Sequence, residues 1–234
     1  MIEGGSPQAP TLPSNPDPAM THRDLERLVT AGEGEYVEFK QRVPTDERIV
    51  KEVIALANTS GGKLLLGVSD DGSIAGVRDP VEERFVLERA LDRHCEPEVE
   101  YTIALVRGQD GKEVLVVDVP ESRKKPHFLV EGQDSDRTAY VRIDDKSVEA
   151  SREVLEMMGE EDRSDAVRIE FGENERKLMR YLDQYERITV DQYARLVDIS
   201  ANSASEILVH LTKINVLSLH ANEKDDFFTL AYPG

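Results

Sequence analysis

Residues 33–77 carry the clearest structural pattern in the chain: EGEYVEFKQRVPTDERIVKEVIALANTSGGKLLLGVSDDGSIAGV. Apolar and polar residues alternate from Tyr36 to Lys40, which is typical of a half-buried strand. From Ile49 to Asn58 the apolar residues share one broad face, so this segment predicts an amphipathic helix. A short strand followed by a helix is therefore the first unit that the sequence predicts.

A glycine pair and a hairpin follow this helix. Thr59-Ser60-Gly61-Gly62 breaks the helical pattern, and Lys63 to Val68 is an apolar run that predicts a strand. Asp70-Asp71-Gly72 is a strong signal for a tight turn into a second strand. Carboxylates thus lie at two of the predicted strand ends, at Glu38 and at Asp70.

The order of these motifs resembles the AlbA-like domain of the Schlafen family. E-x4-E-F-K begins at Glu33, and A-N-T-x-G-G-x-L-L-L-G-V-x-D-D-G begins at Ala57. K-P-H at Lys125 and Y-V-R at Tyr140 continue the similarity, which covers roughly Leu25 to Leu155. The resemblance implies an α+β fold, with a mixed, mainly antiparallel sheet of five or six strands flanked by helices.

The rest of this region supplies further elements. The pattern predicts helices at His22–Thr30, Val81–Cys95 and Val148–Met158, and strands at Val99–Arg107, Lys112–Val119 and Thr138–Ile143. We expect a disordered tail over 1–20, because this segment is rich in Pro, Gly and Ser and has little to bury. The Schlafen-like domain then spans 21–158, and the charged segment 159–166 is a linker.

Residues 167–234 have a different character. Helices are predicted at Glu173–Tyr185, at Thr189–Val197 and from Ser200 to Ile214. Short strands are predicted at Val216–His220 and Phe227–Leu230. Three helices followed by a hairpin resemble a winged helix-turn-helix domain.

Composition limits the classes of function. The chain has 234 residues and a formal net charge of −18, which argues against a general electrostatic grip on nucleic acid. Its single cysteine, Cys95, excludes an internal disulfide and a cysteine-based zinc site. There is no apolar run of about 18 residues and no signal-peptide layout at the start, so we expect a cytoplasmic protein without a membrane span.

The carboxylates suggest a metal-dependent nuclease. The resemblance implies that Glu33, Glu38 and Asp70 hold Mg²⁺ or Mn²⁺ for RNA cleavage, as in some vertebrate Schlafens. Lys40 shares a strand face with Glu38 and would pair with it or touch a phosphate. The alternative is structural: Glu38 and Lys40 form an ion pair of the fold, and Asp70 belongs to a turn.

The glycine pair is a weaker candidate for a ligand site. Related domains were once labelled ATP-binding, but Gly61-Gly62 ends a helix, and no G-K-S/T follows it. A helix C-terminus repels anions, whereas glycine suits a helix C-cap. ATP binding is therefore disfavoured, and no other cofactor is implied.

Basic residues gather later in the chain. The resemblance places Arg123, Lys124, Lys125, His127 and Arg142 near a nucleic-acid groove; a solvated basic loop is the alternative. The predicted third helix carries no Arg, so we favour the C-terminal domain as a dimerisation or partner-docking module over a reader of DNA.

Three classes of function follow. The favoured one is a nucleic-acid-binding protein, either a transcriptional regulator or a DNA- or RNA-binding module. The alternatives are a metal-dependent nuclease and a non-catalytic interaction scaffold, which the acidic surface would suit. A homodimer is expected, because Schlafen proteins carry two such lobes across a groove and this chain carries one.

Overall fold

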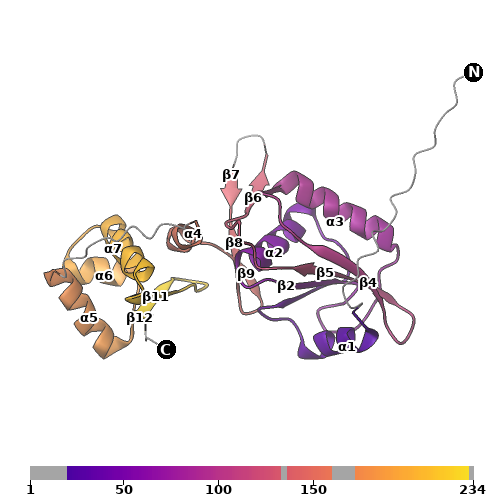
Figure 1. Ribbon diagram of the computed structural model, residues 1–234, viewed down its shortest axis with the longest axis horizontal. Coiled ribbons are helices and arrows are strands. Elements are labelled where there is room, and N and C mark those ends of the chain that lie inside the picture. Colours follow the sequence, from indigo (N-terminus) through magenta and orange to yellow (C-terminus); the bar gives the residue numbers. More distant parts are fainter. Residues whose placement is uncertain (1–19, 133–135, 160–171, 232–234) are drawn as a thin grey trace, which may run out of the picture.

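The computed structural model describes residues 20–132, 136–159 and 172–231. Its main sheet has four strands: β1 (Val37–Lys40), β2 (Gly62–Leu66), β5 (Glu113–Val119) and β4 (Thr102–Arg107), in the order β1-β2-β5-β4. β1 and β2 are parallel and are joined by α2 (Asp46–Asn58), while the other pairs are antiparallel (Figure 1). The expected mixed, mainly antiparallel α+β fold is confirmed.

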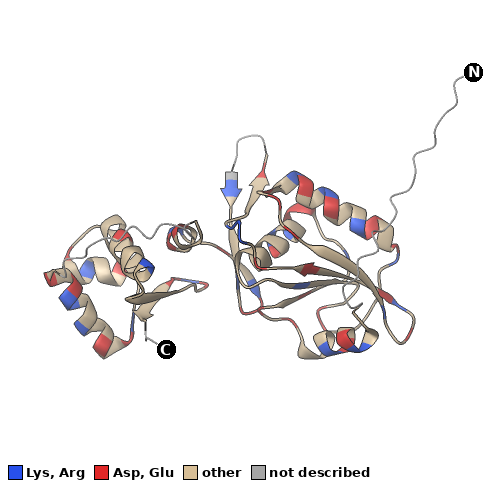
Figure 2. Cartoon of the chain, viewed as in Figure 1, with Lys and Arg blue, Asp and Glu red and all other residues tan. Residues whose placement is uncertain are grey.

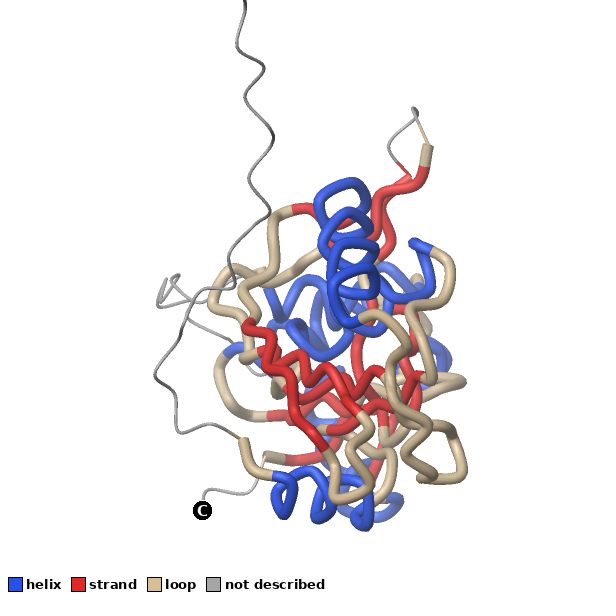
Figure 3. Tube along the Cα trace, turned by 90° about the vertical axis from the view of Figure 1, so that its right-hand side faces the viewer, coloured by secondary structure: helices blue, strands red, loops and turns tan. Residues whose placement is uncertain are grey.

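Helices cover both faces of this sheet (Figure 3). Alternation along the strands divides the core, because successive side chains point to opposite faces. Phe39, Leu65 and Val116 pack with Leu25 of α1 (His22–Ala31). The intervening residues, such as Leu64, Leu66 and Val117, pack against α2 and α3 (Pro80–His94). Figure 2 shows the charged residues mainly on helices and loops.

The remaining strands form two smaller sheets instead of extending the main one. β3 (Cys95–Glu96), β6 (Phe128–Glu131) and β7 (Asp136–Thr138) make one sheet, and β8 (Tyr140–Ile143) and β9 (Lys146–Glu149) make a hairpin. The prediction of one sheet of five or six strands was therefore wrong. The segment after Asp70-Asp71-Gly72 contributes only one isolated bridge, between Val68 and Ile74.

Two predicted elements differ near the end of this first unit. The predicted strand Thr138–Ile143 is interrupted at Ala139, so that its two halves pair with different partners. The predicted helix Val148–Met158 is shorter: Lys146–Glu149 is strand, and α4 (Arg152–Met158) begins only after Ser151. The Ser151 hydroxyl accepts a hydrogen bond from the Val154 amide, which fixes the start of α4.

A second unit has its own core. It comprises α5 (Glu173–Tyr185), β10 (Arg187–Ile188), α6 (Val190–Val197), α7 (Ala201–Lys213), β11 (Leu217–His220) and β12 (Phe227–Leu230). Its sheet has the order β10-β12-β11. Leu178, Tyr193 and Phe228 are among the fully buried residues of this core. The three helices and the hairpin lie where the pattern predicts them, while β10 was not predicted.

The two units touch through α4 and the β11–β12 turn. Leu219 and Ala221 pack against an apolar cluster of the first unit that includes Val141, Val154 and Met158. The Lys146 ammonium lies 2.7 Å from the Glu223 carboxylate, and Ser151 donates to Asp226. In α7, Ser205 donates to Glu153 of α4.

Two further expectations can be compared with only the described part of the chain. Residues 1–19 of the expected tail and 160–166 of the expected linker lie outside the described residues. Among the residues that are described, no helix combines the length and the apolar character needed to cross a membrane.

Candidate functional site

A buried charge network lies at the outer edge of β1. Arg142 of β8 points into it, and only 1% of its side chain is exposed. Its Nη2 donates to Glu38 Oε2 at 2.5 Å and to the Gly34 carbonyl at 2.9 Å, and its Nη1 donates to Glu52 Oε2 at 3.2 Å. A guanidinium placed in this way links β1, α2 and β8 by charge-assisted hydrogen bonds.

This burial contradicts the expectation that Arg142 contacts nucleic acid. A guanidinium that is enclosed by two carboxylates and by backbone carbonyls is not accessible to a phosphate. Glu52 and Ser147 belong to the same network, because both Arg142 and the Ser147 hydroxyl donate to Glu52. No motif in the sequence indicated these two residues.

The predicted carboxylate site shares this network. Glu38 is buried, and its second oxygen accepts from Lys40, which is the pairing named as the structural alternative. Glu33 Oε1 accepts from the Phe39 amide at 2.9 Å. Desolvation raises the pKa of Glu33, and the nearby Glu38 and Asp70 carboxylates also act in this direction. The structure therefore places Glu33 within electrostatic reach of both, while Asp70 stays exposed.

These carboxylates do not fit a metal ion as they stand. Both oxygens of Glu38 already face cations, and one oxygen of Glu33 already accepts an amide. Across the described parts of the chain, no group of three or more His, Cys, Asp or Glu side chains is placed to hold a metal. The nuclease assignment of Glu33, Glu38, Asp70 and Lys40 thus stays a prediction that would need a different arrangement of this network.

A second polar cluster joins the A-N-T and K-P-H motifs. The Asn58 side chain, at the end of α2, donates to the carbonyls of His127 and Tyr140 at 2.9 and 3.0 Å. Its Oδ1 accepts from the His127 amide at 2.8 Å. Asn58 therefore acts as a buried clamp between α2, the loop before β6, and β8. The sequence analysis gave it no such role, although it belongs to the quoted motif.

His127 is also buried, with none of its surface exposed, so it does not contact a nucleic acid directly. Nδ1 lies 2.7 Å from the Pro97 carbonyl and must donate to it, while Nε2 lies 2.6 Å from the Ser122 hydroxyl. Desolvation lowers the pKa of His127, which favours the neutral ring with its proton on Nδ1. This expectation for His127 is corrected: the ring positions a loop.

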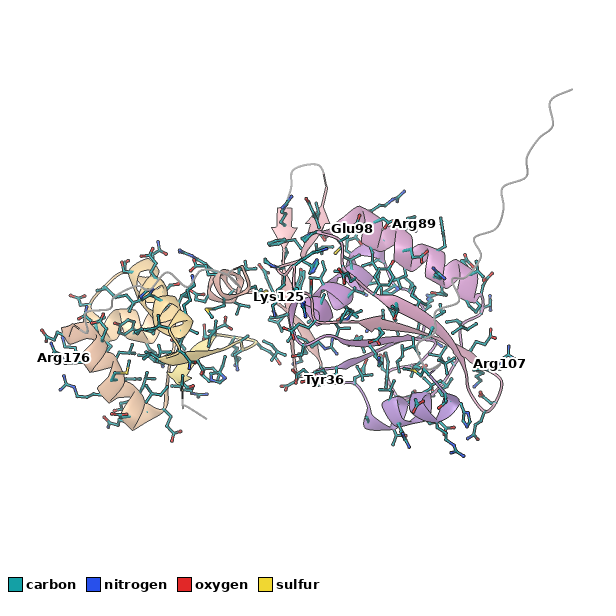
Figure 4. All side chains as sticks on the ribbon, in the orientation of Figure 1. Tyr36, Arg89, Glu98, Arg107, Lys125 and Arg176 are labelled. Carbon is teal, nitrogen blue, oxygen red and sulfur yellow. The ribbon has the colours of Figure 1, made fainter. Side chains whose placement is uncertain are left out.

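The loop that His127 positions carries the basic residues. Ser122 donates its amide to the Ala57 carbonyl at 2.8 Å, and its hydroxyl oxygen accepts from the Lys124 amide at 3.0 Å. Arg123 and Lys124 are exposed, whereas Lys125 is half-buried and pairs with Glu121 at 2.6 Å (Figure 4). Lys124 approaches Glu100 at 3.6 Å. The described residues provide no ion pair for Arg123.

The glycine pair Gly61-Gly62 lets the end of α2 approach the backbone of residues 119–121 and of Tyr36 closely. Gly61 has φ +72°, and a Cβ there would lie 2.6 Å from the Glu121 amide nitrogen. A Cβ on Gly62 would lie 2.7 Å from the Tyr36 carbonyl oxygen. Because both positions face backbone, a side chain cannot be accommodated. The glycines thus bring the basic loop and β1 against the end of α2.

The fold and these two polar clusters define a mixed α/β domain in which widely separated motifs meet around the end of α2. The chain belongs to the family described as Schlafen, AlbA_2, whose profile matches residues 33–151. No curated protein matches the chain.

Two solved structures are similar over part of the chain. One is the DIP2311 protein of Corynebacterium diphtheriae, with 19% identity, a TM-score of 0.39, and coverage of 53% of this chain and 23% of that one. The other is the N-terminal domain of a RecG-related protein of Nitrosomonas europaea, with 27% identity, a TM-score of 0.37, and coverage of 53% and 88%. This chain thus spans less than a quarter of the length of the first.

Proposed function

We propose that this protein binds nucleic acid through the loop 121–126 and does not cleave it. The observation that carries the proposal is the placement of Arg123, Lys124 and Lys125 on a loop that buried hydrogen bonds fix to α2. A fixed backbone lowers the entropy lost when side chains on it engage a phosphate. Membership of the Schlafen, AlbA_2 family supports the same function.

The affinity should be modest and sensitive to salt. The chain carries a net charge of −18, and two of the three cations already have carboxylate neighbours at Glu121 and Glu100. Phosphate contacts release counterions, so binding through a few cations falls as salt rises. Such contacts carry no base information, and the loop should therefore bind different sequences similarly.

The test compares two variants with the same change in charge. Arg123→Ala/Lys124→Ala/Lys125→Ala should weaken binding of labelled single-stranded DNA and of tRNA at low salt by at least tenfold. It should also reduce the slope of log affinity against log salt. Arg176→Ala/Lys177→Ala/Arg180→Ala, on α5, removes the same charge from the other unit and should leave binding close to wild type. Equal loss in both variants would show a general charge effect and overturn the proposal.

Cleavage is tested with Mn²⁺ and the same nucleic acids. The exposed Asp70 permits a variant, Asp70→Asn, that leaves the buried Glu38 network intact. We expect no cleavage by wild type. Metal-dependent cleavage that is lost in Asp70→Asn would establish the nuclease and place Asp70 in its site. Absence of both binding and cleavage at low salt would favour the scaffold function.

We infer that the second unit is a winged helix that docks instead of reading DNA. In this assignment α7 is the third helix and the turn 221–226 is the wing. Ser205 of α7 donates to Glu153, and Glu223 and Asp226 of the wing contact Lys146 and Ser151. The wing is also acidic, since Glu223, Asp225 and Asp226 outnumber Lys224. Phosphate would be repelled there.

We also propose that two copies act together, as the resemblance to two-lobed Schlafens implies. Light scattering at micromolar concentration tests this: a mass near the 26.3 kDa of one chain would contradict it.

A further inference from the structure

An apolar groove lies between α3 and β4. Val81 and Phe85 of α3 are 68% and 61% exposed, and Leu105 of β4 is 45% exposed. With Ile103 and Leu115 they line a groove of about 570 Å³. Arg107, at the end of β4, and Lys125, on the basic loop, lie at opposite ends of the first unit (Figure 4).

The groove adjoins an open sheet edge. β4 is the last strand of the main sheet and pairs only with β5 among the described strands (Figure 1). From Thr102 to Val106 it contains no charge, no proline and no glycine, and only its last residue, Arg107, is charged. Edge strands in monomers are usually protected by such residues, because their free N–H and C=O groups pair with other chains.

The opposite edge of the sheet is protected. β1 is short, it carries the charged Glu38 and Lys40, and Arg142 donates to the Val37 carbonyl. β4 carries a charge only at its last residue, Arg107, and its other residues are uncharged. Together with the exposed apolar side chains beside it, this indicates that the edge has a partner.

We propose that the partner is a second copy of this chain, which adds its own β4 antiparallel to this one. A twofold axis through an antiparallel strand pair requires one residue to lie opposite itself, because hydrogen-bonded and non-bonded pairs alternate. Ala104 is the suitable centre, being small and exposed. Ile103 then faces Leu105 of the partner subunit, on the same side of the sheet as Phe85.

The charges at the two ends of β4 favour this antiparallel arrangement. Glu98 and Glu100 precede the strand, and Arg107 ends it. Antiparallel pairing places Arg107 of each copy opposite Tyr101 of the partner subunit and beside its Glu100. A parallel pair would instead bring like charges together. The main sheets of the two copies would join into one, with the Val81 and Phe85 side chains covered near the junction.

The first test measures mass by sedimentation or light scattering at about 100 µM protein, which is roughly a hundred times the concentration of half-dissociation for a dimer with a Kd of about 1 µM. Wild type should have about twice the mass of one 26.3 kDa chain. Phe85→Asp and Leu105→Lys should each return the mass of one chain with unchanged circular dichroism, and with a Tm that no longer rises with protein concentration. Tyr36→Lys is the control. Tyr36 is also an exposed aromatic residue, with 54% of its surface accessible, but it lies far from Arg107 (Figure 4), so this variant should remain dimeric.

The second test fixes the register. In a Cys95→Ser background the chain has no other thiol, so Ala104→Cys should be linked efficiently to its own copy by a short bismaleimide. Ala75→Cys, on an exposed loop, is the matched control and should be linked at least tenfold more slowly.

Two results would overturn the proposal. One is a monomeric wild type at the concentration of the first test, and the other is a dimer that survives both Phe85→Asp and Leu105→Lys. If the wild type is monomeric and dimerises when residues 1–19 are deleted, the N-terminal segment is the occupant of the groove instead. None of these measurements involves nucleic acid, so they can fail independently of the proposed nucleic-acid binding. A monomeric wild type would also contradict the proposal that two copies act together, whereas a dimer that survives both variants would contradict only the β4 interface.

Discussion

Arg142 stabilises the fold through a charge pair that has almost no contact with water. Removing one partner of a buried pair leaves the other charge desolvated and unpaired, which costs about 3–5 kcal/mol. Glu38 keeps its contact with Lys40 when Arg142 is replaced. We therefore expect Arg142→Met to lower the free energy of unfolding by no more than this amount, measured by urea denaturation. Arg195→Ala breaks the exposed pair with Asp191 and should cost less than about 1 kcal/mol.

The double variant Glu38→Gln/Arg142→Met provides the internal control. Because it removes both charges, its loss should be smaller than the sum of the two single losses. Strictly additive losses would mean that Glu38 and Arg142 do not depend on each other, contrary to the contact between them.

His127 predicts a dependence of stability on pH. Its pKa in the folded protein is lowered from the ordinary value of 6.5, chiefly by desolvation. Below pH 6.5 the unfolded chain therefore binds a proton that the folded chain resists, and stability falls as the pH falls. One proton gives a slope of at most about 1.4 kcal/mol per pH unit.

This contribution is isolated by comparing wild type with His127→Gln between pH 7.5 and 5.5, an interval of about one pH unit on either side of the ordinary histidine pKa. The variant should be less stable at the higher pH, because Pro97 and Ser122 lose a partner. Its stability should also change less across the interval. An identical pH dependence in the two proteins would remove His127 as the cause.

Single residues show where sequence reasoning succeeds and where it fails. The Glu38–Lys40 pair was predictable as one of two alternatives, since residues two apart on a strand share a face. The burial of Arg142 was not predictable from its strand alone. Its partners Gly34, Glu38 and Glu52 lie about a hundred residues earlier in the sequence, and only the tertiary fold brings them to it.

At the scale of elements, the end of α2 is connected to the loop before β6 and to β8 through Asn58. Asn58→Ala would leave the His127 amide and the carbonyls of His127 and Tyr140 without a partner in a buried site. Buried unsatisfied groups cost about 1–3 kcal/mol each, so the variant should lose at least about 2 kcal/mol.

Hydrogen exchange would localise this loss. The amide of His127 should exchange faster in Asn58→Ala, while amides in the center of the second unit, such as Tyr193, should keep their protection. Uniformly faster exchange in both units would instead indicate global unfolding.

Most elements were predictable from periodicity, because helices such as Glu173–Tyr185 have a strong amphipathic pattern between clear ends. The structure of the segment 138–149 was not predictable from periodicity. Asp144 adopts φ 53°, and Ile143 pairs with Lys146, so Asp144-Asp145 is a two-residue hairpin loop. The apolar residues after this loop favoured a helix, and only pairing with β8 makes Lys146–Glu149 a strand. Assignment of strands to separate sheets likewise depends on contacts that the sequence does not encode locally.

At the scale of the whole molecule, the contact between the two units decides what the second unit can do. The turn 221–226 packs Ala221 against the apolar cluster around Val154, and polar contacts hold it on either side. If this turn is the wing that we propose, it cannot lie along a nucleic-acid backbone while these contacts persist. Release of the turn is therefore the step that would separate docking from DNA reading.

Ala221→Asp tests this directly. A carboxylate facing Val154 and next to Glu223 and Asp226 should detach the second unit, because it buries a charge without a partner. We expect a larger radius of gyration in small-angle scattering, with circular dichroism unchanged. Ala201→Asp adds the same charge at the exposed start of α7, where an acid is tolerated, and should leave the radius unchanged. If the released unit bound DNA more tightly than wild type, the docking assignment would be wrong, and the wing contact would be inhibitory instead.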